Sequence, residues 1–220
     1  QYSARLAFSP TKSSQPNKKM FLGFAPTFSN IDADAESMIT TRGSVVNLKW
    51  NSSEVETIQK LFDSEVYVGE TAKESALKES LEHSRIVHLA THAIVDENNI
   101  LNSQIVLANE QDSLQDGILH AFEIYNLRLN TELVTLSACN TGFGVLNDGE
   151  GSMTLARAFS YAGVQSVVMS HWEVDDKLTS DLMAHFYENI NYGMRKDQAL
   201  QKAKLSLIAE SDALVSNPYY

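Results

Sequence analysis

The chain has 220 residues, of which 43% are hydrophobic and 20% are charged, so it is long enough to bury one good-sized core. Its net charge of −11 at pH 7 disfavours binding to polyanions such as nucleic acid and favours a cationic partner. The sequence has no run of about 18 apolar residues and no signal-peptide pattern, so we expect a cytoplasmic protein without a membrane segment.

The chain begins with a polar stretch that differs in composition from the rest. Residues 9–19 are rich in Ser, Pro, Lys and Asn, and we expect residues 1–19 to form a flexible lead-in or linker from a missing N-terminal region. We expect residues 20–220 to form a single domain. Because the first residue is Gln1 rather than Met, we also expect the chain to be a piece of a longer protein.

Apolar runs and amphipathic segments alternate along the remainder of the chain. The predicted strands or apolar runs are 19–26, 64–69, 85–90, 104–108, 133–139 and 165–172, and the predicted helices are 53–62, 71–82, 120–126, 152–163, 179–191 and 197–210. Near-continuous Val, Ile and Leu strands between such helices predict an α/β fold with a mostly parallel sheet covered on both faces. We expect residues 95–109 to carry the chain back into that sheet.

Two of the predicted helices start with the pattern of a capping box. Ser53 is followed three residues later by Glu56, and Thr71 is followed three residues later by Glu74. In this pattern the first side chain and the acidic side chain each bind a backbone N–H group of the first turn. The two patterns predict helix N-termini at Ser53 and Thr71.

Two chemically versatile residues follow predicted strands. His92 comes after the strand 85–90, and Cys139, the single cysteine, ends the strand 133–139. Parallel sheets gather ligands and catalytic groups at the carboxyl ends of their strands. An imidazole that takes the proton of a thiol makes it a nucleophile, so His92 and Cys139 are a candidate dyad, although a lone cysteine can also be a small core residue.

The neighbourhood of Cys139 suits attack on a carbonyl group. It lies 47 residues after His92, near the roughly 50 that separate the two residues in caspase-type peptidases. The backbone N–H groups of Cys139 and Ala93 are candidates for an oxyanion hole. The glycine-containing segment 142–151 lacks the order of a phosphate-binding loop, and we interpret it as a mobile active-site loop.

His88 and His92 raise the alternative of a zinc site, because H-x-x-x-H on a helix places two ligands on one face. The segment is predicted as a strand, in which four residues span about 13 Å, too far for a single ion. We therefore predict no metal, and we interpret His88 as a hydrogen-bonded core histidine.

Three acidic residues follow the strand 165–172, namely Glu173, Asp175 and Asp176. One interpretation is structural: acidic residues at the N-terminus of a helix are stabilised by the positive end of the helix dipole. Alternatively, they line a pocket beside the thiol that selects a Lys or Arg side chain of a substrate.

The chain carries, in order, the short motifs "ATHA", "LSACNTG", "GEG", "RAF", "AG", "SVV", "WEVDD" and "LMAHFY". With these motifs, residues 47–208 resemble the CHAT domain family, which comprises caspase-like and separase-like proteins often attached to tetratricopeptide repeats. Family members typically have "ATHG" and "LSACETG", so Ala93 and Asn140 depart from the pattern. The Ala93 departure affects the oxyanion contact only if that position needs a positive φ angle.

The resemblance implies a caspase-like three-layer α/β/α sandwich and cysteine endopeptidase chemistry by a His92–Cys139 dyad. It also implies a protein or peptide substrate, cleavage after a basic residue through Asp175 or Asp176, and activation by a partner or an N-terminal repeat domain. No cofactor is expected. The alternatives are a proteolytically silent module for regulation or protein interaction and a flavodoxin-like ligand binder, which the missing phosphate loop disfavours.

Overall fold

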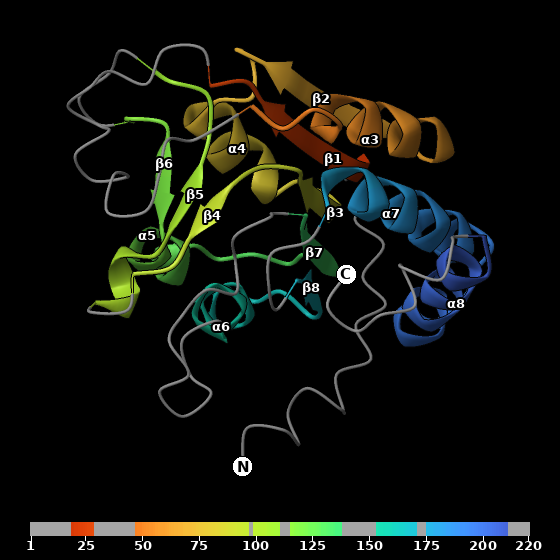
Figure 1. Cartoon of the computed structure of the whole chain (residues 1–220). Coiled ribbons are helices and arrows are strands. Elements are labelled where there is room, and N and C mark those ends of the chain that lie inside the picture. Colours follow the sequence, from red (N-terminus) through yellow and green to blue (C-terminus); the bar gives the residue numbers. More distant parts are fainter. Residues whose placement is uncertain are drawn as a thin grey trace.

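The computed structural model describes residues 19–28, 47–96, 99–110, 115–137, 153–170 and 175–210. Within these ranges the centre of the molecule is a five-stranded sheet with the strand order β2-β1-β3-β7-β8 (Figure 1). The strands are β1 (Lys19–Pro26), β2 (Ser64–Gly69), β3 (Ser84–Leu89), β7 (Leu133–Leu136) and β8 (Val167–Met169). Every neighbouring pair in this sheet is parallel, which confirms the predicted strand arrangement.

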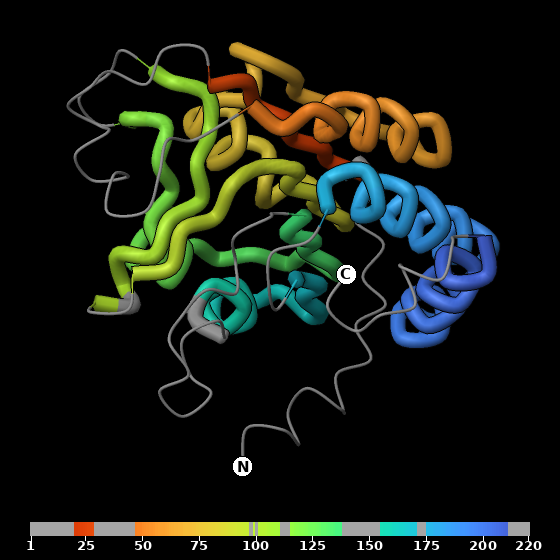
Figure 2. The backbone as a smooth tube through the Cα atoms, viewed as in Figure 1, coloured from red at the N-terminus to blue at the C-terminus, as the bar shows by residue number. Residues whose placement is uncertain are grey.

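Helices cover both faces of the sheet, as predicted (Figure 1). One face carries α4 (Glu74–Leu81), α5 (Ala121–Asn126) and α6 (Met153–Ala162), and the other carries α3 (Asn51–Ile58), α7 (Asp176–Asn191) and α8 (Lys196–Glu210). The helices of each face pack on a separate hydrophobic cluster. Figure 2 shows α3 and α7 side by side, although they are far apart in the sequence.

The three central strands, β1, β3 and β7, are mostly apolar because both of their faces are buried. In β3, Val87 and Leu89 join the cluster under α4 and α6, whereas Ile86 joins the cluster under α3 and α7. His88 alternates onto the second face with Ile86, and there it contacts Tyr187 of α7. The period of two thus places a histidine inside the α3–α7 layer.

A second sheet corrects one prediction. The strands β4 (Ala93–Ile94), β5 (Gln104–Val106) and β6 (Ile118–His120) form a separate antiparallel sheet of the described residues, so residues 95–109 do not return the chain to the main sheet. The reason is that β5 pairs at once with β4, while β7 takes the place beside β3. A short 3₁₀ turn, η2 (Ile100–Asn102), precedes β5.

Both predicted capping boxes are wrong, the first because α3 begins two residues before Ser53. Its N-cap is Trp50, which makes no side-chain capping bond, and the Ser53 hydroxyl donates to the Trp50 carbonyl at 2.9 Å. The helix starts early because the buried Asn51 amide is bound by strand ends, as described below. A 3₁₀ turn, η1 (Gln59–Leu61), extends the helix.

The second box fails because Thr71 belongs to the turn after β2. Its hydroxyl donates to the Val68 carbonyl at 2.7 Å and accepts the Val68 N–H at 3.0 Å. The N-cap of α4 is Lys73, and the Glu74 carboxylate accepts the N–H of Gly117 at 3.2 Å. The Glu74 side chain thus binds the distant Gly117 backbone instead of the backbone at Thr71.

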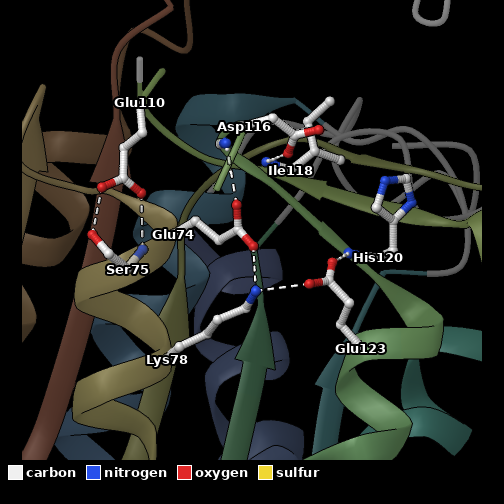
Figure 3. A network of polar contacts seen from close by, with 9 residues as sticks. Glu74, Ser75, Lys78, Glu110, Asp116, Ile118, His120 and Glu123 are labelled. Atoms are coloured by element: carbon white, nitrogen blue, oxygen red, sulfur yellow. Dashed lines mark hydrogen bonds and ion pairs between the residues drawn. The ribbon is translucent and has the colours of Figure 1, made fainter. Parts of the chain in front are cut away.

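Charged side chains join α4 and α5 to the small sheet (Figure 3). The Lys78 ammonium lies 2.5 Å from the Glu74 carboxylate and 2.7 Å from that of Glu123. Glu123 also accepts the N–H of His120 at 2.9 Å. We call Glu74, Lys78 and Glu123 the Lys78 network. No helix of the described residues is both long and apolar enough to span a bilayer.

Candidate active site

The backbone around His92 is held at the carboxyl edge of the main sheet by several hydrogen bonds. The carbonyl oxygen of His92 accepts the N–H of Val106 at 2.9 Å, and the buried Thr91 hydroxyl donates to the Val106 carbonyl. Two residues before His92, the N–H of Ala90 donates to the carbonyl of Phe24 at 2.8 Å. The backbone at His92, which lies between β3 and β4, is therefore fixed in place.

The side chain of His92 is half-buried and packs against an aromatic ring. The ring centroids of His92 and Phe28 are 5.2 Å apart, and the rings are tilted by 52°. Phe28 follows β1, and its N–H donates to the side-chain oxygen of Asn47 at 2.7 Å. The contact restricts the orientation of the imidazole and leaves part of it accessible.

Asn51 is a buried anchor at this edge that sequence reasoning missed. Its side-chain amide donates to the carbonyls of Pro26 at 2.9 Å and of Ala90 at 3.3 Å, and its oxygen accepts the Ser52 N–H at 2.7 Å. The residue is 3% exposed. Asn51 thus joins the start of α3 to the ends of β1 and β3. No local pattern marks it, because both carbonyl partners are distant in the sequence.

Cys139 lies outside the described residues, so its contact with His92 stays a prediction. The strand that leads to it is described as far as Ser137, whose N–H donates to the Leu89 carbonyl at 2.9 Å. Leu89 and Leu136 face each other in the register of β3 and β7. In the sequence His92 is the third residue after Leu89, and Cys139 is the third after Leu136.

The predicted oxyanion contact through Ala93 is also untested. Ala93 is fully buried, begins β4 and pairs with Ile105. A strand backbone needs no glycine, so alanine at this position is compatible with the local structure. The loop 142–151 and Asn140 lie outside the described residues.

The acidic residues lie at the start of α7, with Glu173 outside the described residues. Asp175 is the N-cap of the helix, and its carboxylate accepts the N–H of Leu178 at 2.9 Å. The carboxylate of Asp176 accepts the N–H of Trp50 at 3.0 Å and so joins the starts of α7 and α3. These bonds give both acidic residues a structural role at the start of α7. A substrate-binding role for them stays a prediction.

His88 is a hydrogen-bonded core histidine, as predicted. It is fully buried, and its ring nitrogens contact the Glu54 carboxylate at 2.7 Å and the Tyr187 hydroxyl at 3.2 Å. These partners lie 34 and 99 residues away in the sequence. Within the described ranges, no three His, Cys, Asp or Glu side chains are grouped so that they could hold a metal ion.

Comparison with known proteins identifies the family. The chain is 24% identical over 192 residues to tetratricopeptide repeat protein 28 of Mus musculus, and the match covers 73% of this chain but only 8% of that protein. The CHAT domain family model matches residues 2–220. We conclude that the chain belongs to the CHAT domain family, a caspase-like family.

Proposed function

We propose that this domain is a cysteine endopeptidase in which His92 and Cys139 form the catalytic dyad. The observation that carries the proposal is the register of two neighbouring strands, in which Leu89 faces Leu136. His92 and Cys139 are each the third residue after these partners, and both strands end at the same edge of the sheet. Membership of a caspase-like family supports the same assignment.

The proposed reaction begins when the His92 imidazole takes the proton of the Cys139 thiol. The thiolate sulfur attacks the carbonyl carbon of the scissile peptide bond, and the N–H groups of Cys139 and Ala93 stabilise the resulting oxyanion. His92 then returns the proton to the leaving amine, which gives an acyl-enzyme. Water, deprotonated by His92, attacks this thioester and releases the acid and the free thiol.

The proposed substrate carries a Lys or Arg side chain before the cleaved bond. The acids assigned to its recognition are Asp175, Asp176 and Glu173, and the first two lie where α7 meets the start of α3. A carboxylate has several acceptor positions, so the one backbone N–H group that Asp175 and Asp176 each bind leaves them able to accept from a cationic side chain as well. The net charge of −11 supports a basic substrate as well.

We further propose that a partner or an N-terminal repeat domain activates the enzyme, with the segment 142–151 as the responding loop. The support is the similarity to a tetratricopeptide repeat protein, of which this chain spans 8% of the length. Ordering of an active-site loop is a common means of activation.

The dyad can be tested without a known substrate, because Cys139 is the single cysteine of the chain. The rate of alkylation by iodoacetamide should be measured against pH for the wild-type chain and for His92→Gln. A dyad predicts a thiol pKa below the ordinary value of about 8.5 in the wild-type chain and a return toward it in the variant. Identical profiles at the ordinary value would contradict the proposal.

The alternative is a silent CHAT module that serves in regulation or protein interaction. The small share of the mouse relative that this chain spans favours it, because the module is a minor part of a repeat protein. A thiol-reactive peptide probe with Lys or Arg separates the two functions when it is tested with the parent protein. Labelling that His92→Gln abolishes supports the peptidase, and its absence under every activating condition supports the silent module.

A further inference from the structure

Four buried polar side chains from four different elements meet on the face of the main sheet that α3 and α7 cover. We call them the His88 quartet: Glu54 of α3, His88 of β3, Thr135 of β7 and Tyr187 of α7. Each is at most 2% exposed. Buried polar groups are stable only when they are hydrogen-bonded, so the four elements must be placed to suit all of these contacts together.

The hydrogen bonds form a chain with a defined direction. The Tyr187 hydroxyl donates its single hydrogen to the Thr135 hydroxyl at 2.8 Å, so it accepts from the Nδ1–H group of His88 at 3.2 Å. The Nε2 atom of His88 then shares one proton with the Glu54 carboxylate over 2.7 Å. Both ring nitrogens of the buried His88 thus have a polar partner.

The quartet is tied to one register of the two central strands. His88 and Thr135 face each other across β3 and β7, and Tyr187 contacts both of them. A slip of one residue would turn one of these side chains to the opposite face of the sheet. The surrounding residues of this layer, such as Ile86 and Phe186, are apolar and make no directional bonds. The polar contacts therefore specify the register more strictly than apolar packing does.

The same strands lead to the proposed catalytic residues. His92 is four residues after His88, and Cys139 is four residues after Thr135. We propose that the His88 quartet positions the dyad, with Tyr187 and Glu54 holding β3 and β7 in the one register that brings His92 and Cys139 together. This inference rests on the proposed function, and its members act as positioning residues rather than catalytic ones.

Two comparisons of variants test the inference. Tyr187→Phe removes the hydroxyl that links the strands to α7, and Phe186→Leu is its matched control on the same helix and in the same apolar cluster. Glu54→Leu removes the partner of His88, whereas Glu54→Gln keeps a side chain that can donate to Nε2 and should rescue the function. All variants are assayed in the intact chain at a temperature where circular dichroism shows them folded.

The readout is the pH profile of Cys139 alkylation by iodoacetamide, which a loss of global stability alone does not move. We expect Tyr187→Phe and Glu54→Leu to raise the midpoint by about one unit, which lowers the rate at acidic pH by about tenfold. Phe186→Leu and Glu54→Gln should retain the wild-type midpoint. If either Tyr187→Phe or Glu54→Leu does not fold, the profile of the other variant tests the inference.

The outcomes separate this inference from the proposed function. In one outcome the wild-type profile depends on His92, but Tyr187→Phe and Glu54→Leu, where folded, retain that profile. This outcome overturns the positioning role alone. A wild-type profile at the ordinary thiol value that His92→Gln does not change overturns the dyad, and the positioning role with it. An equal shift in Phe186→Leu and Tyr187→Phe would also overturn the inference, because general loosening of α7 would then explain the effect.

Discussion

The His88 quartet and the Lys78 network are both polar clusters that join helices to strands, but they differ in their contact with water. In the quartet the side chains of His88 and Glu54, which lie 2.7 Å apart, are 0% and 2% exposed. In the network Glu74 is 1% exposed, whereas the side chains of Lys78 and Glu123 are 26% and 24% exposed. Water can therefore partly replace a lost partner in the network and cannot do so in the quartet.

Burial raises the pKa of one group in each cluster. Burial raises the pKa of the Tyr187 hydroxyl far above 10.0, and the charge of Glu54 adds to this against the opposing bond to Thr135. Tyr187 thus remains a donor throughout the pH range of a stability measurement. Burial also raises the pKa of Glu74 above 4.5, although the pair with Lys78 opposes the rise.

The largest effect should come from breaking the quartet. His88→Leu leaves the carboxyl group of Glu54 buried without its partner. Loss of one member of such a buried polar pair should reduce the free energy of unfolding by about 3–5 kcal/mol. Urea unfolding followed by circular dichroism measures the loss. The double variant Glu54→Leu with His88→Leu should recover most of it, because no polar group of the pair is then left. A double variant as unstable as the single one would show that shape, not charge, governs the site.

A smaller effect is expected where the Lys78 network meets the small sheet, at Gly117. This residue has a φ angle of +82°, and a Cβ atom there would lie 2.8 Å from the carbonyl oxygen of Ala108. Gly117→Ala should therefore reduce the free energy of unfolding by about 1–3 kcal/mol. Gly193 has a φ of +83° and nothing within 4 Å of the added atom, so Gly193→Ala measures the backbone strain alone. Equal losses in the two variants would contradict the steric part of the argument.

Lys78→Met tests the network itself. At pH 7 it leaves the carboxylates of Glu74 and Glu123 close together without the cation, which should reduce stability by about 1–2 kcal/mol. Lys177→Met is the matched control, because Lys177 also pairs with an acid four residues away but is 59% exposed. It should change stability little. A loss in Lys78→Met that equals the loss in the control would remove the distinction between half-buried and exposed pairs.

The pH dependence of Lys78→Met follows from the raised pKa of Glu74. The folded state binds the proton more tightly than the unfolded state, so its advantage is full below about pH 4.5 and is lost as the pH rises through the folded-state pKa. Removal of Lys78 raises that pKa further, since Lys78 lowers it. The destabilisation should therefore shrink as the pH falls toward 4. A constant difference between the variant and the wild type from pH 4 to pH 7 would contradict this assignment.

The strands of the main sheet and the helices that cover it could be predicted from the sequence, because the hydrophobic patterns that indicate them are local. The apolar run of β3 and the amphipathic pattern of α7 each arise within a short segment. The helix starts at Ser53 and Thr71 were predicted wrongly because distant contacts decide them. Asn51 binds strand carbonyls 25 and 39 residues away, and its burial moves the start of α3.

The candidate site was predictable only in part. The position of His92 after a buried strand followed from the sequence, and the structure has it at the carboxyl edge beside Phe28. The aromatic contact, the Asn51 anchor and the His88 quartet needed the fold, because their members come from separate elements. The pairing of His92 with Cys139 stays a prediction that the alkylation profile will test.

The smallest effect should come from Arg85→Ala, which removes an exposed ion pair with good geometry. Two guanidinium nitrogens of Arg85 lie 2.8 and 3.2 Å from the Glu132 carboxylate, but the side chains are 45% and 37% exposed. Solvent screening should limit the loss to about 0.5 kcal/mol or less. The change should also raise the pKa of the nearby Lys196 ammonium, which burial lowers and the charge of Arg85 lowers further. Urea unfolding checks the first effect, and a loss larger than that of Lys78→Met would show that contact geometry, rather than exposure, ranks the polar clusters of this fold.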